Sequence, residues 1–161
     1  MQDYVIELRE TVEKATPRLL ALGNQIESEP EEPGRWSRRE IIGHLIDSAA
    51  NNHRRFVLGQ LEDNLDFPGY RQEEWVKVQR YREAPWEELV DLWQSYNLHL
   101  ARLMDAVSEE IREKEHRIHS FSEIAWQTPD EGKPATLDYL MRDYVGHLKN
   151  HLVQIFGKDA M

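Results

Sequence analysis

The chain has 161 residues, 40% hydrophobic and 31% charged, a composition that predicts one globular domain over residues 1–161 with a sizeable core. Its formal net charge of −10 argues against nucleic acid and anionic membranes as partners, because both are bound through clustered basic residues. The absence of cysteine excludes disulfides, thiolate metal sites and cysteine nucleophiles, and the absence of any signal-like or membrane-length apolar run leads us to expect a cytoplasmic protein.

The first predicted helix covers residues 3 to about 27, where apolar residues recur at spacings of three and four. The stripe consists of Val5, Leu8, Val12, Ala15, Leu19, Leu22 and Ile26. Pro17 lies inside it and has no backbone N–H to donate, so it predicts a kink or a division of the helix. In a divided helix, Thr16 is the expected N-cap and Pro17 the first helical residue.

The second predicted helix follows a loop and runs to about residue 61. Ser37 and Glu40 have the spacing of a capping box, and Trp36 precedes the cap like one half of a hydrophobic staple. One face of this helix carries polar side chains where a plain bundle would carry leucine or alanine. They include His44, Ser48, Asn52 and Arg55. This face is more polar than packing alone requires.

The remaining elements complete a helical pattern. A long, aromatic-rich connection over residues 62–84 contains a predicted short helix at residues 72–79. The third helix is predicted from near Pro85 to about residue 114, and a second connection follows. Thr136 is the predicted N-cap of the last helix and Gly157 its end. Four long helical patterns without a convincing strand predict an all-α four-helix bundle.

The last predicted helix carries His147 and His151, four residues apart and therefore on one face. Apolar residues share that face, so the imidazoles point towards a core, where a divalent metal is the usual solution for paired histidines. His44, on the polar face of the second helix, is the best candidate for a third ligand. Three nitrogen ligands leave a position for water or substrate. We expect zinc or nickel, with iron or manganese as alternatives.

Other metal signatures fit less well. A zincin needs glutamate after its first histidine, whereas Leu148 follows His147. A di-iron bundle needs two Glu-x-x-His pairs, and only Glu113 to His116 has that spacing. Of the other histidines, His99 is a minor ligand candidate. The rest are expected near the surface or in solvent: His53, His116 and His119.

In order along the chain, these motifs resemble the DinB/YfiT-like superfamily of metal-dependent hydrolases. The matching features are Trp-Ser at residues 36–37, His-Leu-x-Asp from His44, and His-x-x-x-His from His147. The likeness extends over nearly the whole chain and is greatest for the YfiT-like branch, which contains thiol S-transferases acting with bacillithiol. The resemblance implies an up-down-down-up four-helix bundle, often a homodimer, with a divalent metal held by His44, His147 and His151.

A metal with an open position lowers the pKa of a bound water or thiol. Asp47, one turn after His44, is a candidate to orient an imidazole, and Tyr144 is expected to pack or to donate to a bound ligand. Asn52 and Arg55 are candidates for the wall of an anion-binding pocket.

We therefore expect a metal-dependent thiol S-transferase or hydrolase acting on a small molecule through a metal-activated thiolate or water. A low-molecular-weight thiol is the expected cosubstrate of the transferase. Two alternatives remain open: a non-catalytic metal-binding stress-response or sensor protein, and a metal-free helical dimer whose histidines are structural.

Overall fold

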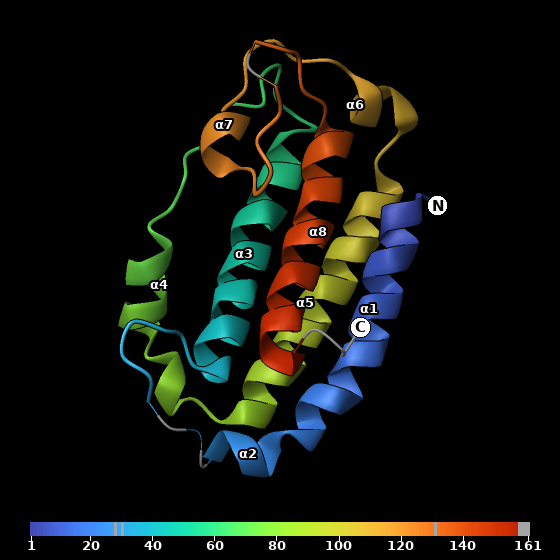
Figure 1. Ribbon diagram of the computed structural model, residues 1–161. Helices are drawn as coiled ribbons and strands as arrows, with labels where there is room; N and C mark the ends of the chain where they lie inside the picture. The colour runs from blue at the N-terminus through green and yellow to red at the C-terminus, as the bar shows by residue number, and fades with distance from the viewer. Residues whose placement is uncertain (28, 30, 131, 158–161) are drawn as a thin grey trace.

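The computed structural model describes residues 1–27, 29, 31–130 and 132–157. Its four long helices are α1 (Asp3–Ala21), α3 (Arg38–Leu58), α5 (Trp86–Ala106) and α8 (Leu137–Phe156). Figure 1 shows that α1 and α8 run in one direction and that α3 and α5 run in the other. This is an up-down-down-up order, so the predicted all-α four-helix bundle is confirmed.

Short helical elements occupy the connections between the long helices. They are α2 (Gly23–Glu27), α4 (Gln72–Gln79), the 3₁₀ turn η1 (Tyr81–Glu83), α6 (Glu109–Glu113) and α7 (Phe121–Ile124). The short helix predicted at residues 72–79 is thus present, whereas α7 was not predicted. Two isolated bridges, Leu65 with His119 and His116 with Ala135, join the connections at one end of the bundle. None of the described helices is both long and apolar enough to cross a membrane.

The core lies between the four long helices, each of which buries one apolar face. The buried face of α1 repeats most of the predicted stripe: Val5, Leu8, Val12, Ala15 and Leu19. The predicted caps are also confirmed. Ser37 and Glu40 form a full capping box, the Thr136 hydroxyl accepts from the Tyr139 N–H, and Gly157 ends α8.

Of the two outcomes predicted for Pro17, a kink or a division of the helix, the division does not occur there. Helix α1 continues through Pro17 to Ala21, and Leu22, with φ −78° and ψ −6°, forms the turn that separates α1 from α2. Thr16 is not an N-cap, because its hydroxyl donates to the Val12 carbonyl 2.8 Å away inside the helix. The lost backbone bond at Pro17 does not divide the helix, since Ala15 and Leu19 on either side are buried in the core.

The third long helix is shorter than predicted. Helix α5 ends at Ala106, and Val107 has extended backbone geometry with φ −71° and ψ 126°. Ser108 then caps α6 by accepting from the Ile111 N–H at 3.4 Å. A serine hydroxyl that caps a new helix competes with continuation of the old one, which accounts for the break inside an apolar-periodic stretch.

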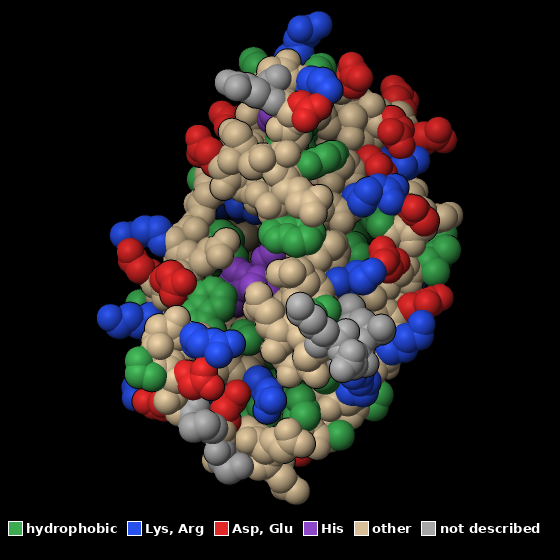
Figure 2. Space-filling model, viewed as in Figure 1, with side chains coloured by type: hydrophobic (Ala, Val, Ile, Leu, Met, Phe, Trp, Pro, Cys, Tyr) green, Lys and Arg blue, Asp and Glu red, His purple; other side chains and the backbone are tan. Residues whose placement is uncertain are grey.

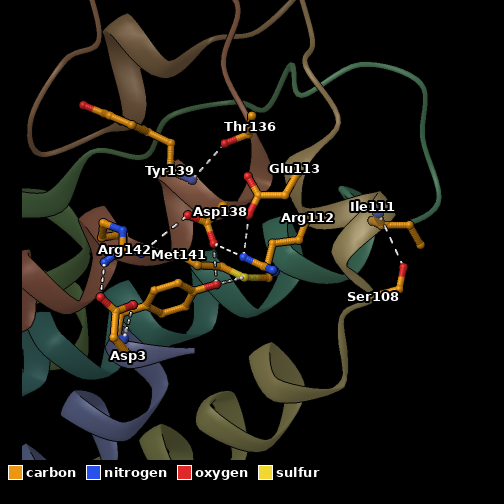
Figure 3. A network of polar contacts seen from close by, with 11 residues as sticks. Asp3, Ser108, Ile111, Arg112, Glu113, Thr136, Asp138, Tyr139, Met141 and Arg142 are labelled. Atoms are coloured by element: carbon orange, nitrogen blue, oxygen red, sulfur yellow. Dashed lines mark hydrogen bonds and ion pairs between the residues drawn. The ribbon is translucent and has the colours of Figure 1, made fainter. Parts of the chain in front are cut away.

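A polar network fixes the first turn of α8 to neighbouring elements (Figure 3). Asp138 accepts from the Tyr4 hydroxyl of α1 at 2.9 Å and from the Arg112 guanidinium of α6 at 2.8 Å. Arg142, one turn later, pairs with Asp3 at 3.0 Å. These contacts set the axial position of α8 against α1, and with it the height at which the α8 histidines meet α3.

Candidate metal centre

Three histidines converge between α3 and α8. The Nε2 atoms of His44 and His147 are 3.3 Å apart, and those of His147 and His151 are 3.0 Å apart. One ligand atom of each of the three residues lies within 4.8 Å of the others. The structure thus brings together the three residues that the sequence singled out as metal ligands.

The spacing of these nitrogens fits a divalent ion. Imidazole nitrogens bind zinc at about 2.0–2.1 Å, so two ligands of one ion lie about 3.0 Å apart at a right angle and about 3.4 Å apart at a tetrahedral angle. The distances of 3.0 and 3.3 Å fall in that interval. A cluster of three imidazole nitrogens suits zinc, nickel, iron or manganese and does not choose among them.

Burial keeps the three rings neutral, which is the ligand form. Loss of hydration lowers the pKa of His44 to about 3 and that of His147 to about 4, and the neighbouring imidazoles add to the effect. Burial also lowers the pKa of His151. At neutral pH each ring therefore has a nitrogen lone pair to offer a cation.

The second ring nitrogens differ in their surroundings. His151 Nδ1 lies 2.9 Å from the Gln154 side-chain oxygen, which favours the tautomer that leaves Nε2 free to bind a metal. His44 Nδ1 is buried without a hydrogen-bond partner among the described residues. Asp47, the residue predicted to orient an imidazole, does not reach it.

Asp47 faces the connection between α3 and α5 instead of the triad. Its Oδ1 accepts from the Tyr81 hydroxyl and from the Gln79 amide, both at 2.7 Å. Tyr144 also points away from the imidazoles: its hydroxyl donates to Asn97 Oδ1 at 2.5 Å inside the core. Packing, one of the two roles expected for Tyr144, is therefore the role it has.

Two tryptophans flank the triad. The Trp36 ring centroid is 4.8 Å from that of His44 and 6.5 Å from that of His151, and the Trp126 centroid is 6.4 Å from that of His147. In Figure 2 the purple histidines are visible at the surface between green hydrophobic groups. The Trp36 and Trp126 rings thus border the triad, and His147 and His151 remain partly exposed.

Trp126 was missed at the sequence level because it lies in the second connection, far from the histidine motifs. Asp143 holds it in place by accepting the backbone N–H groups of Trp126 and Gln127, each at 2.8 Å. Gly146 leaves room for the ring, since a Cβ there would lie 3.0 Å from Trp126 Cζ3. A glycine immediately before His147 was the available signal of such a close approach.

A cleft of about 1430 Å³ begins beside the triad. Its lining includes Trp36, which contacts His44, and Gln154, which contacts His151. It extends along α4 and η1 and is lined there by Tyr81 and other side chains of the connection. The three histidines are not among the residues that line this cleft, so it adjoins the triad through Trp36 and Gln154.

The other histidines lie outside this cluster. His53 and His99 face each other with ring centroids 5.0 Å apart. The expectation that His116 is solvated is wrong, because its side chain is buried and its Nδ1 bonds to the Asp63 carbonyl oxygen at 2.8 Å. The bridge between His116 and Ala135 draws it into the end of the bundle.

A model of the DinB superfamily matches residues 7–155. The chain belongs to the DinB superfamily. A protein of Geobacillus thermodenitrificans named "Putative metal-dependent hydrolase" is 22% identical over 158 residues, which cover 98% of this chain and 83% of the relative. A protein of Bacillus cereus with the same description is 25% identical over 75 residues, 47% of this chain and 43% of the relative.

A solved structure supports the fold of this DinB-superfamily chain. YfiT from Bacillus subtilis, described as "a probable metal-dependent hydrolase with an unusual four-helix bundle topology", matches with a TM-score of 0.73 at 21% identity. The match covers 95% of this chain and 82% of YfiT. The resemblance inferred from the histidine motifs is therefore confirmed at the level of family and fold.

Proposed function

We propose that this DinB-superfamily protein binds a divalent metal ion through Nε2 of His44, His147 and His151, and that it is a metal-dependent hydrolase or thiol S-transferase of small molecules. The observation that carries the proposal is the convergence of three neutral imidazole nitrogens, two pairs of them 3.0 and 3.3 Å apart, between α3 and α8. Zinc or nickel is the proposed ion, with iron or manganese as alternatives.

A divalent ion with an open position supplies a Lewis acid that lowers the pKa of a bound water or thiol towards neutrality. The protein contributes rings held neutral by burial and a Gln154 contact that orients His151. Trp36 and Trp126 limit water at the sides of the site. Among the described residues, no carboxylate bonds to a triad imidazole, so a thiol whose proton leaves to solvent suits this site as well as water does.

The lack of a neighbouring acid–base group also favours a second candidate. Hydrolysis commonly uses a positioned base beside the metal, and none of the described side chains in contact with the three rings is one. A metal-binding stress-response or sensor protein without catalysis needs only the triad.

The family resemblance also leads us to propose a homodimer. Size-exclusion chromatography with light scattering tests this oligomeric state.

The metal is tested by elemental analysis of protein purified without a histidine tag, followed by titration of the chelated protein with zinc and nickel. We expect about one ion per chain and, for His147→Ala, an affinity loss above about a hundredfold, since even partners outside the ligand set are worth 10–100-fold. His99→Ala is the matched control, because its ring is partly exposed and outside the cluster. Equal zinc affinity of His147→Ala and wild type would remove the proposal.

Catalysis is tested separately with the metal-loaded protein. Conjugation of an electrophilic aromatic halide with low-molecular-weight thiols, and cleavage of a panel of esters and amides, distinguish the transferase from the hydrolase. Turnover that is lost in His147→Ala and kept in His99→Ala supports an enzyme. A metal-loaded protein without turnover in either assay supports the sensor.

A further inference from the structure

Arg55 of α3 is a buried cation without an anionic partner. It is 5% exposed and is the one arginine or lysine buried among the described residues. Its Nη1 donates to Asn52 Oδ1 at 3.4 Å and its Nη2 to the Pro68 carbonyl at 3.1 Å. Both acceptors are neutral, and no described carboxylate lies within ion-pair distance of the guanidinium. Of the five N–H donors of a guanidinium, most remain available.

This arrangement is costly unless an anion completes it. A buried charge left unpaired is strongly destabilising, and arginine does not escape the cost by losing its proton. Burial lowers the pKa of Arg55, and the group that opposes this effect is the neighbouring Tyr70 phenol and not a carboxylate. The net charge of −10 means that carboxylates outnumber basic side chains in this protein. A carboxylate partner for Arg55 is therefore absent despite the many that the chain contains. A guanidinium kept free of carboxylates is a feature of anion-binding sites.

The guanidinium lines a cavity of about 510 Å³, within the usual 300–1,000 Å³ of small-molecule sites. Arg54 and Arg71 also line it; Arg54 is exposed with no partner among the described residues, and Arg71 pairs with Glu74 at 3.0 Å. Two exposed carboxylates, Glu62 and Asp66, belong to the lining, and neither pairs with an arginine of the described chain.

The remaining walls are aromatic and apolar. Tyr70 and Trp75 meet edge to face with centroids 5.1 Å apart, and Leu58 and Phe67 add apolar surface. Walls of this kind accept a flat apolar body, and the planar fork of Arg55 matches a carboxylate bidentately.

We propose that this pocket binds a small organic carboxylate with an aromatic or apolar body, and that the Arg55 guanidinium holds its carboxylate. Arg54 adds a second positive charge at the mouth. Arg55 follows His44 by eleven residues, about 16 Å along α3, and three helical turns place both on the same side of the helix. The site is separate from the triad and does not depend on metal binding.

The test is calorimetric titration of the chelated protein with phenylacetate, with neutral phenylacetamide and with inorganic phosphate. We expect phenylacetate to bind at least roughly tenfold more tightly than phenylacetamide, because only the carboxylate gains charge-assisted bonds. Equal binding of acid and amide, or binding of phosphate in place of phenylacetate, overturns the proposal. Phenylacetate binding that requires added zinc overturns it as well, since the anion would then sit on the metal.

Variants assign the binding to the pocket. Arg55→Lys keeps the charge without the planar fork and is expected to lose roughly tenfold in phenylacetate affinity. Arg54→Gln is expected to lose less, and Arg35→Gln, exposed and outside this pocket, nothing. Wild-type binding by Arg55→Lys and Arg54→Gln together overturns the assignment.

A stability measurement separates a ligand site from a structural arginine. Arg55→Met removes the buried charge and keeps much of the side-chain volume, so we expect a melting temperature equal to or above that of wild type. Phenylacetate should raise the melting temperature of wild type and not that of Arg55→Met. A large loss of melting temperature in Arg55→Met, with no effect of phenylacetate on wild type, would make Arg55 a structural residue.

Discussion

The ring of Tyr81 lies directly against the backbone of Gly43, one residue before the metal-ligand candidate His44. A Cβ at position 43 would lie 2.1 Å from Tyr81 Cδ2, a distance that real atoms do not adopt. The same tyrosine donates its hydroxyl to Asp47 on the next turn of α3. Tyr81 thus packs the connection onto α3 at the level of the triad, and only glycine permits this approach.

We predict that Gly43→Ala lowers stability by about 2–3 kcal/mol, because the aromatic ring and its hydrogen bond must move. In an open helix the same change would add up to about 1 kcal/mol. Gly23→Ala is the control, since a Cβ at that position would have no atom within 4 Å. Urea unfolding of both variants measures the difference, and equal stability would show that Tyr81 moves aside freely.

Asp47 is predicted to matter for stability and not for metal affinity. Asp47→Ala leaves the Tyr81 hydroxyl and the Gln79 amide without their acceptor, at a cost of about 1–3 kcal/mol. Zinc affinity should stay within about twofold of wild type, whereas a residue that orients a ligand would cost 10–100-fold. Asp105→Ala, on the exposed side of α5, controls for loss of a charge. A tenfold loss of zinc affinity in Asp47→Ala would contradict the structural assignment.

Asp143 is predicted to hold Trp126 beside the triad. Removing its carboxylate in Asp143→Ala leaves the N–H groups of Trp126 and Gln127 unpaired, at a cost of about 1–2 kcal/mol. Amide hydrogen exchange at these two residues should accelerate, while exchange in the middle of α8 stays unchanged. Asp130→Ala in the same connection, exposed and paired with Lys133, should leave both amides as they are.

The metal-free protein is predicted to lose stability as the pH falls from about 7 to 5. In the unfolded chain histidine has a pKa of about 6.5, whereas in the fold the pKa of His44 is about 3 and that of His147 about 4. The unfolded state therefore takes up protons first, and the free energy of unfolding falls with pH by up to about 1.4 kcal/mol per unit for each histidine. The loss of stability levels off once the pH falls below the pKa values that His44 and His147 have in the folded protein.

Chemical unfolding of chelated protein at a series of pH values measures this slope. His147→Gln removes one titrating ring and should make the dependence shallower between pH 7 and 5. Added zinc should make the stability of the wild-type protein depend more steeply on pH, because protons and metal compete for the same nitrogens. A His147→Gln variant with the wild-type slope would mean that His147 takes up its proton as readily in the fold as in the unfolded chain.

Features that depend on a few neighbouring residues, such as helix caps and the face of a helix, were predicted correctly from the sequence. The capping residues Ser37 and Thr136 were found because a cap needs only its own first turn. His147 and His151 were placed on one face by helical periodicity alone. The end of α5 was missed although Ser108 is a good capping residue, because the apolar spacing continued through Ile111.

Contacts between distant segments could not be predicted in the same way. The partners of Asp47 come from α4 and η1, and Trp126 reaches His147 from a connection whose path depends on Asp143. Nothing in the spacing of these residues reveals which connection folds over which helix. The meeting of His44 with α8 was expected first from the polar face of the second helix and then from the family resemblance, because periodicity gives the face of a helix and not its neighbour.

The separation of the triad along the chain has a consequence for how the protein acquires an ion. His44 and His147 stand 103 residues apart, so in an unfolded chain only the pair on the α8 segment can act together. An ion bound by all three is bound by the folded chain alone, and its binding free energy adds to the stability of the fold. The amount of folded protein in a cell would then follow the supply of that ion, and scarcity of the metal would be felt first as degradation of the chain.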